Sequence, residues 1–243
     1  TLFNAPVSEY VYWRTKHLVD GKTFTYDSES ESYNPDEGDF PPPVLANDFR
    51  GLPEGFGEGT KTSAYARLKD GPLRQMVFEE SFGPFNPTPM NDLGDPLPVI
   101  DDFLVTDLAS GQPTLRWFTR GPTGGKVGYF RSYFYRADYC CGSSGQWTFI
   151  TANPDAGEWT SPMLPPDIAA LHQDPELTIE PNRATITDTN WASFGDFAST
   201  PGFSPYEFGS CTVLEDWFDF EGDATEGRLR RTGLFLNGSD PCD

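Results

Sequence analysis

The chain has 243 residues, with 24 glycines, 23 prolines and a formal net charge of −20. This length suits one large β domain or two small ones, and the glycine and proline content favours short strands and loops over long helices. Aromatic residues make up 15% of the chain, which excludes low-complexity disorder. The negative charge disfavours nucleic acid and anionic lipid as partners, and no apolar run approaches the roughly 20 residues of a membrane span.

The first predicted element is a β-hairpin. Its first strand, Val7–Val19, carries aromatic side chains on both faces, and Asp20-Gly21 separates it from the strand-like run Thr23–Tyr26. Asp-Gly between two such runs predicts a two-residue turn. We also consider that Val7–Val19 adds to the sheet edge of a second copy, with pairing inside its own chain as the alternative.

An acidic stretch follows at residues 27–48, with seven Asp or Glu residues and no Lys or Arg. It is predicted to be a solvated loop or an ordered excursion. Within it, Asn34, Asp36 and Asp39 offer oxygen atoms on a turn-prone segment, and calcium prefers oxygen ligands. We therefore consider a calcium site here, with solvated charge as the alternative. Asp216–Glu226 is a second acidic segment of this kind.

Strand-like runs continue through the rest of the chain, interrupted by a glycine-rich segment at 51–60 and a proline-rich loop at 81–98. The run Lys126–Tyr139 has apolar side chains on both faces, which is typical of a central strand, and Pro166–Leu171 is the one predicted helix. The remaining predicted strands are Ser63–Leu68, Leu73–Glu79, Val99–Leu108, Thr114–Thr119, Gln146–Thr151, Trp159–Leu164, Leu177–Thr187, Cys211–Phe220 and Arg228–Leu236.

Strands spaced about 8–12 residues apart, with turn residues between them, predict an all-β protein. We expect an antiparallel β-sandwich of the fibronectin III, immunoglobulin or jelly-roll kind, with long Pro/Gly-rich acidic loops and very little helix. Residues 1–97 are expected to form an N-terminal hairpin and loop-rich region that packs on the core. Residues 98–243 are expected to form the sandwich itself, with one continuous domain as the alternative.

Short motifs between residues 98 and 190 carry a family resemblance. They are Leu115-Arg116-Trp117, the tyrosine-rich run Val127–Tyr133, Trp147-Thr148-Phe149 and Met163-Leu164-Pro165. This stretch resembles a fibronectin type III-like or immunoglobulin-like β-sandwich. The resemblance implies an extracellular module and implies no activity, because a fold does not determine function.

The four cysteines are Cys140, Cys141, Cys211 and Cys242. Adjacent cysteines rarely bond to each other, because the ring strains the peptide between them. Two pairings remain, and each joins the vicinal pair to Cys211 and Cys242. Either pairing would attach the C-terminal tail to the sandwich. In the chain-entropy model each bond would stabilise the folded state by about 4–5 kcal/mol, less any strain. Four buried free thiols are the alternative.

Other features agree with a secreted, extracellular or cell-surface location. Asn237 begins the glycosylation sequon Asn-Gly-Ser. The chain starts at Thr1 rather than at a methionine, which fits a removed targeting segment and fits a chain boundary equally well.

Motifs of catalysis are weak. The spacing of Gly142–Gly145 does not match a nucleophile elbow, and His17 and His172 are expected to be structural. Two carboxylates would suffice for glycoside hydrolysis, and Glu79-Glu80 and Asp101-Asp102 lie at strand ends. Because successive strand residues point to opposite faces, neither pair is expected to act together. We therefore predict no catalytic residue and lean against an enzyme.

Surface aromatic residues suggest a binding role instead. The tryptophans nearest to turns or edges could stack on sugar rings, with core packing as the alternative; they are Trp13, Trp147, Trp159 and Trp191. A basic island at Arg228, Arg230 and Arg231 is expected to pair with the acids of the molecule itself.

Together these features predict a secreted or cell-surface β-sandwich protein with a structural, adhesive or assembly role, such as a filament or surface-array subunit. Its partners would be further copies of the chain or a surface polysaccharide, and the only cofactor considered is calcium. A carbohydrate-binding module is the first alternative. A jelly-roll glycoside hydrolase or polysaccharide lyase is the second.

Overall fold

The computed structural model describes residues 1–20, 22–45, 53, 55–70, 73–107, 110–125, 127–136, 145–172, 177–189 and 227–235. These residues form strands β1 to β14, one short α-helix, α1 (Pro166–His172), and two 3-10 turns, η1 (Pro35–Glu37) and η3 (Pro154–Ala156). The predicted all-β antiparallel sandwich with little helix is therefore confirmed.

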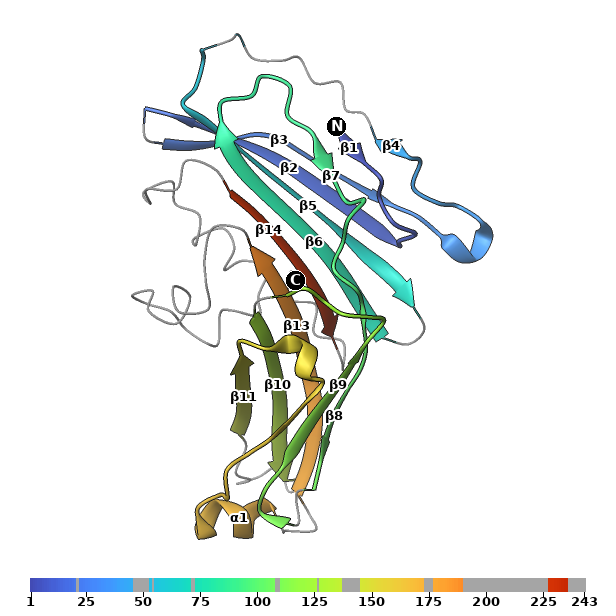
Figure 1. The fold of residues 1–243 in the computed structure, drawn as a ribbon. Helices are drawn as coiled ribbons and strands as arrows, with labels where there is room; N and C mark the ends of the chain where they lie inside the picture. Colours follow the sequence, from blue (N-terminus) through green and yellow to red (C-terminus); the bar gives the residue numbers. More distant parts are fainter. Residues whose placement is uncertain are drawn as a thin grey trace.

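One long sheet organises the molecule (Figure 1). It has eight strands, and each pairs antiparallel with its neighbours. In spatial order they are β11 (Gly145–Thr151), β10 (Val127–Arg136), β13 (Leu177–Thr189), β14 (Gly227–Phe235), β6 (Leu73–Pro84), β5 (Gly59–Asp70), β2 (Tyr10–Val19) and β3 (Lys22–Ser32). Strand β14 lies between β13 and β6, so it joins strands from the two halves of the chain into one sheet.

Two three-stranded sheets cover this long sheet. The first consists of β4 (Val44–Leu45), β1 (Leu2–Phe3) and β7 (Asn91–Asp92), and the second of β12 (Glu158–Thr160), β9 (Thr114–Thr119) and β8 (Ile100–Thr106). Val77 belongs to the core under the first sheet and Leu234 to the core under the second. Thr232 pairs with Val77 and lies two residues from Leu234, so both cores lie on the same face of the long sheet. We call it the inner face.

The core under β8, β9 and β12 is built on stacked aromatic rings. Trp117 and Phe130 stack with ring centroids 4.2 Å apart, and Trp117 Nε1 donates a hydrogen bond to the carbonyl oxygen of Pro154 at 2.6 Å. Gly128 permits this arrangement, since a Cβ there would lie 2.9 Å from the Phe130 ring. Burying each large apolar side chain contributes about 1.5–3 kcal/mol, so this core anchors the second half of the molecule.

The other core lies under β1, β4 and β7. It contains Trp13 of β2 together with Leu2, Val11, Leu45 and other apolar side chains. The two-residue strand β1 pairs with β4 antiparallel and with β7 in parallel. The N-terminal segment therefore closes this core as a lid of very short strands.

The predicted hairpin is confirmed. Strand β2 ends at Val19, β3 begins at Lys22, and Asp20 between them has φ 51°. This left-handed conformation is one that Asp tolerates in tight turns.

The acidic segment differs from its prediction at its start, because residues 27–32 belong to strand β3 rather than to a loop. Strand β3 is the outermost strand beside β2 among the described strands. An edge strand has one side open, so Glu29 and Glu31 are exposed there without cost. Charged side chains are a common feature of such edges. The alternating serines and acids of this edge strand have the composition of a loop, which is why the sequence predicted one.

Strand β10 is an interior strand but not the central one. It lies next to the outer strand β11, while β14 and β6 occupy the middle of the sheet. Tyr129 and Phe130 point to opposite faces of β10, and both are 0% exposed. Coverage of both faces is confirmed at Tyr129 and Phe130; the predicted central position is wrong.

Candidate functional site

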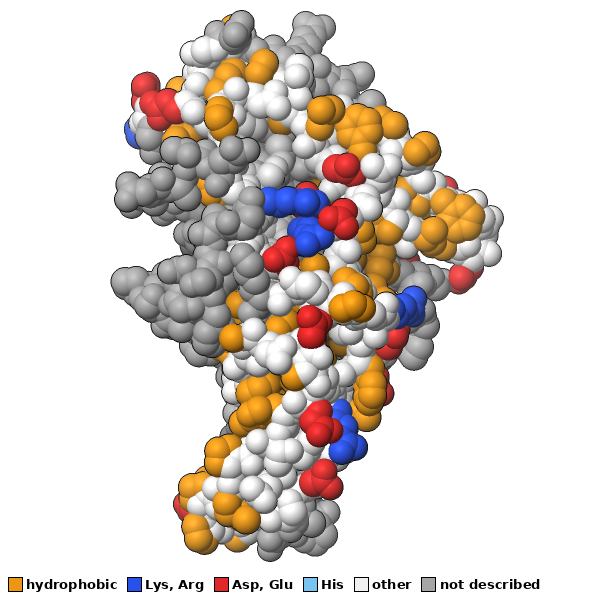
Figure 2. All heavy atoms as spheres, in the orientation of Figure 1, with side chains coloured by type: hydrophobic (Ala, Val, Ile, Leu, Met, Phe, Trp, Pro, Cys, Tyr) orange, Lys and Arg blue, Asp and Glu red, His pale blue; other side chains and the backbone are white. Residues whose placement is uncertain are grey.

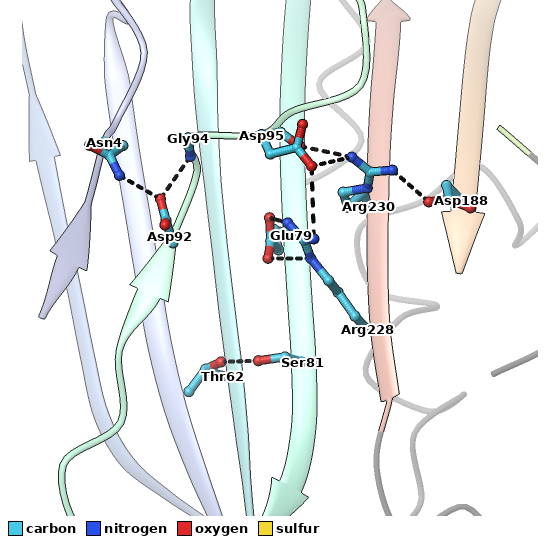
Figure 3. Close-up of polar contacts among 10 residues, drawn as sticks. All are labelled: Asn4, Thr62, Glu79, Ser81, Asp92, Gly94, Asp95, Asp188, Arg228 and Arg230. Carbon is cyan, nitrogen blue, oxygen red and sulfur yellow. Dashed lines mark hydrogen bonds and ion pairs between the residues drawn. The ribbon is translucent and has the colours of Figure 1, made fainter. Parts of the chain in front are cut away.

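A cluster of charged side chains lies on the inner face between the two cores. It contains Arg228 and Arg230 of β14, Glu79 of β6, Asp188 of β13 and Asp95 from the segment between β7 and β8. We call it the arginine cluster. Lys/Arg side chains gather between Asp/Glu side chains in the middle of this face (Figure 2), and Figure 3 shows the contacts.

Arg228 and Glu79 form a two-pronged ion pair. Arg228 Nε donates to Glu79 Oε1 at 2.7 Å, and Nη2 donates to Oε2 at 2.9 Å. The hydrogen bond with Glu79 raises the pKa of Arg228 against the opposing effect of burial. The planar guanidinium fits a carboxylate in this geometry, so the fork holds β14 to β6.

Arg230 extends the cluster in the other direction. Its Nη1 donates to Asp95 Oδ2 at 2.8 Å and to the Asp95 carbonyl oxygen at 3.1 Å, and its Nη2 donates to Asp188 Oδ2 at 2.7 Å. Arg230 therefore ties the segment between the two small sheets to β13 and β14. The prediction that this basic island pairs with the acids of the molecule itself is confirmed for Arg228 and Arg230.

A cavity of about 380 Å³ lies beside this cluster. Its floor contains two hydroxyl groups from adjacent strands, with Thr62 Oγ1 2.7 Å from Ser81 Oγ (Figure 3). Arg228 lines one side. The full lining is Thr60, Thr62, Ser81, Phe82, Gly83, Pro84, Asn86, Pro89, Met90, Gly227 and Arg228. Sequence reasoning missed this cavity, because its residues come from three strands and a loop.

His17 contacts Thr60, which lines the cavity, and is structural, as predicted. Its Nδ1 is 3.0 Å from Thr60 Oγ1, and its ring is 5.1 Å from that of Phe85. The same Thr60 hydroxyl accepts a hydrogen bond from the Asn86 backbone N–H at 2.8 Å. Burial lowers the pKa of His17. These contacts hold the 85–86 segment against β5 and β2.

Glu79 and Glu80 point to opposite faces of the long sheet, as predicted. Glu79 belongs to the arginine cluster on the inner face, whereas Glu80 Oε1 lies 3.0 Å from Lys61 Nζ on the outer face. Ser63 Oγ donates to Glu80 Oε2 at 2.9 Å. The Lys61 and Glu80 side chains are both 2% exposed, so this is a buried ion pair.

A buried arginine lies within electrostatic range of Glu80 on this face. Arg231 is buried, its Nε donates to Thr187 Oγ1 at 3.1 Å, and burial together with the neighbouring Arg183 lowers its pKa to about 10. Attraction from Glu80 opposes that shift. The outer face at this point is thus a buried, charged layer that sequence alternation did not reveal.

The second acidic pair also separates. Asp101 Oδ1 accepts a hydrogen bond from exposed Arg120 at 2.7 Å, and Asp102 Oδ1 accepts one from the Phe103 N–H at 2.8 Å. Each carboxylate therefore has its own partner, and the β8–β9 register shifts between Ile100 and Asp102. As predicted, neighbouring acids in a strand do not form a joint site here.

The predicted sugar-stacking tryptophans have different surroundings. Trp13 is 2% exposed inside a core, so that assignment is wrong for Trp13: strand alternation placed its ring on the inner face. Trp159 is half-buried and stacks on Phe149 at 4.3 Å, and Trp147 is half-buried on β11. Trp191 lies outside the described residues.

The predicted calcium segment forms a compact turn around η1. The Asn34 carbonyl oxygen accepts the N–H groups of Glu37 and Asp39, and Asp39 Oδ2 accepts the Asn34 N–H at 3.3 Å. Within the described ranges, no three His, Cys, Asp or Glu side chains are grouped as metal ligands. A calcium site formed by Asn34, Asp36 and Asp39 stays a prediction, and Asp216–Glu226 lies outside the described residues.

Several predicted features lie outside the described part of the chain: Cys140, Cys141, Cys211, Cys242, the sequon at Asn237 and the strand at Cys211–Phe220. In the part that is described, no helix combines the length and apolarity needed to cross a membrane.

Strand β2 pairs with both β3 and β5. The first predicted strand therefore has both sides occupied within its own chain.

Comparison with known proteins gives little further information. No family model and no curated protein sequence matches the chain. Among solved structures, it is similar to the FN1–FN3 domains of chicken CNTN1, with 14% identity and a TM-score of 0.17. That match covers 74% of this chain and 48% of the other, so it spans about half of the CNTN1 chain.

Proposed function

We propose that this chain is a secreted or cell-surface β-sandwich protein with a structural and adhesive role. The observation that carries the proposal is the arginine cluster. Arg228 and Arg230 join β6, β13, β14 and the segment between the small sheets through three carboxylates. These charged groups hold the two cores to one sheet, which suits a stiff module that spaces or displays other groups.

The surface supports an adhesive part of this role. Phe24, Phe40 and Phe56 are each at least half exposed, and exposed aromatic side chains are enriched in protein contact surfaces. Addition of a second copy along β3 is disfavoured, because Glu29 and Glu31 on that edge would repel their counterparts. We therefore propose side-chain contacts, rather than pairing of β3 edges, as the basis of adhesion.

Cooperative unfolding tests the structural role. We expect the whole chain to unfold in one transition, because β14 and the arginine cluster connect both cores. Replacing Arg230 with methionine should weaken that connection and separate the unfolding of the two cores, while Arg120→Met, at an exposed pair with Asp101, should not. Two independent transitions in the unmodified protein would overturn the proposal.

Activity and assembly assays complete this test. Incubation with polysaccharides is expected to release neither reducing ends nor unsaturated products, and sedimentation across a wide range of protein and salt concentrations should reveal contact between copies or with an added polysaccharide. Enzymatic turnover would instead favour the jelly-roll hydrolase or lyase.

A second candidate function, carbohydrate binding, is favoured by the half-buried aromatic group at β11 and β12. Phe149 and Trp159 stack, and Trp147 precedes Phe149 by two residues on β11, so it shares the same face. Aromatic rings with one open face stack on the C–H faces of sugars. Polysaccharides should change tryptophan fluorescence in the unmodified protein and not in Trp159→Ala. No change in either protein would remove this candidate.

Disulfides, calcium and the fibronectin III-like or immunoglobulin-like character of residues 98–190 belong to the same proposal. Non-reducing peptide mapping should link Cys140 and Cys141 to Cys211 and Cys242, and free thiols would count against secretion. Calcium bound at Asn34, Asp36 and Asp39 should raise the melting temperature. A melting temperature unchanged by a chelator would remove the calcium site.

A further inference from the structure

We propose that the cavity beside the arginine cluster binds a neutral sugar, either a free monosaccharide or the terminal residue of a neutral oligosaccharide. This site goes beyond the structural role and uses none of the tryptophans. The proposal stands on three features of the cavity: its hydroxyl floor, its apolar wall and the neutralised arginine at its side.

The floor can hydrogen-bond to hydroxyl groups in both directions. Thr62 and Ser81 pair across β5 and β6, and their oxygens lie 2.7 Å apart. One hydroxyl donates to the other, which leaves the second hydroxyl proton and several lone pairs. Sugars carry groups that both donate and accept, so they match such a floor better than a ligand with acceptors alone.

The walls leave room and provide apolar surface. Gly83 follows Ser81 by two residues on β6, so its missing side chain would have pointed to the same face. Pro84, Pro89 and Met90 add apolar atoms to the lining. The volume of about 380 Å³ falls in the range of small-ligand sites, roughly 300–1,000 Å³. This combination fits the polar edge and the C–H face of a pyranose.

The charges favour a neutral ligand over an anion. The guanidinium of Arg228 is already held by both oxygens of Glu79, and Asp95 Oδ2 lies 3.9 Å from its Nη1. An anion that accepted from the remaining N–H groups of Arg228 would lie close to the negative charges of Glu79 and Asp95, on a protein of net charge −20. A sugar hydroxyl can instead donate to Glu79 and accept from Arg228 without separating them.

Binding is tested on the whole chain with defined probes. Glucose, galactose and mannose are titrated against the protein by calorimetry and by ligand-observed NMR, with glucuronate and inorganic phosphate as anionic probes. We expect at least one neutral sugar to bind saturably and more tightly than either anion. Failure of all three sugars to saturate, or preference for an anion, would overturn the proposal.

Two variants locate the site. Gly83→Val fills the cavity and should abolish saturable binding; Ser81→Ala removes one hydroxyl and should weaken it about 3- to 10-fold. Thr160→Ala is the matched control, because it breaks a similar hydroxyl pair with Thr114, 3.0 Å apart, on another sheet. Should Gly83→Val fail to fold, Ser81→Ala decides by itself.

The same variants separate this site from the aromatic group at β11 and β12. If Gly83→Val and Ser81→Ala bind as the unmodified protein does, the cavity is not the site. If Trp159→Ala abolishes the binding while both cavity variants retain it, the sugar binds at the aromatic group and the proposal fails. Neither result bears on cooperative unfolding, so the structural role stands or falls independently.

Discussion

Replacing Lys61 with methionine is expected to destabilise the protein strongly, because it leaves the Glu80 carboxylate buried without its cation. The Lys61 Nζ and Glu80 Oε1 atoms lie 3.0 Å apart, and both side chains are 2% exposed. At that distance, an effective dielectric constant of 20 gives an attraction of about 5.5 kcal/mol. Desolvation of the two ions offsets much of it, but breaking a buried pair typically costs about 3–5 kcal/mol. We expect that loss in the free energy of unfolding.

A double-mutant cycle separates the interaction from the cost of each change. Lys61→Met and Glu80→Gln are measured singly and together by chemical denaturation. The double variant is expected to be more stable than the sum of the single losses by about 3 kcal/mol, since no charge then remains uncompensated. Lys22→Met, at an exposed lysine, is the control and should change stability by less than about 0.5 kcal/mol. Additive losses would refute the reasoning.

The pH dependence provides a second check with a definite sign. Burial raises the pKa of Glu80, while Lys61 opposes that rise. The native state therefore holds a proton that the unfolded chain releases above pH 4.5, and stability falls as pH rises through the raised pKa. Without Lys61 the pKa of Glu80 rises further. The loss caused by Lys61→Met should thus be smaller near pH 5 than near pH 8, because protonation of Glu80 removes the uncompensated charge. An equal loss at both pH values would contradict this.

Burial also lowers the pKa of Lys61, with Glu80 opposing and Lys16 and Arg14 adding to the effect. In the unfolded chain Lys61 keeps its proton up to its ordinary pKa of 10.5. The free energy of unfolding therefore increases as pH rises from the lowered pKa toward 10.5, and decreases as pH falls. Lys61→Met should abolish this alkaline rise. Titration of stability between neutral and alkaline pH measures it.

Three further changes test other parts of the structure by denaturation. Burial lowers the pKa of His17, so stability should fall as pH drops from 6.5 through the lowered pKa, and His17→Gln should remove this dependence. Arg228→Lys keeps the charge but loses the fork to Glu79, and should cost about 1–2 kcal/mol, whereas Arg120→Lys at an exposed pair should cost less than about 1 kcal/mol. Trp13→Ala should cost about 3–5 kcal/mol, because the ring fills a closed core. A loss of less than about 1 kcal/mol for Trp13→Ala would contradict the burial of this ring in the core.

The local elements could be predicted because each is determined by neighbours in sequence. Alternation and the Asp20-Gly21 pair predicted the β2–β3 hairpin, and Thr114–Thr119 was placed with the bounds that β9 has. The strand at residues 27–32 was missed because its side chains are those of a loop. Its strand conformation comes from hydrogen bonds to β2, and composition does not report a partner.

The candidate sites show the same contrast between features determined by neighbours in sequence and features determined by a partner strand. Alternation alone predicted that Glu79 and Glu80 face opposite ways, and it made Arg228 a plausible partner for some acid. It could not say which acid, since Arg228 and Glu79 are 149 residues apart and meet only because β14 enters the sheet beside β6. The cavity depends on the same event, because Arg228 lines it beside Thr62 and Ser81 only through the pairing of β14 with β6. A site built across strands from both ends of a chain is therefore determined by sheet order, and sheet order is the property that a period-two pattern leaves open.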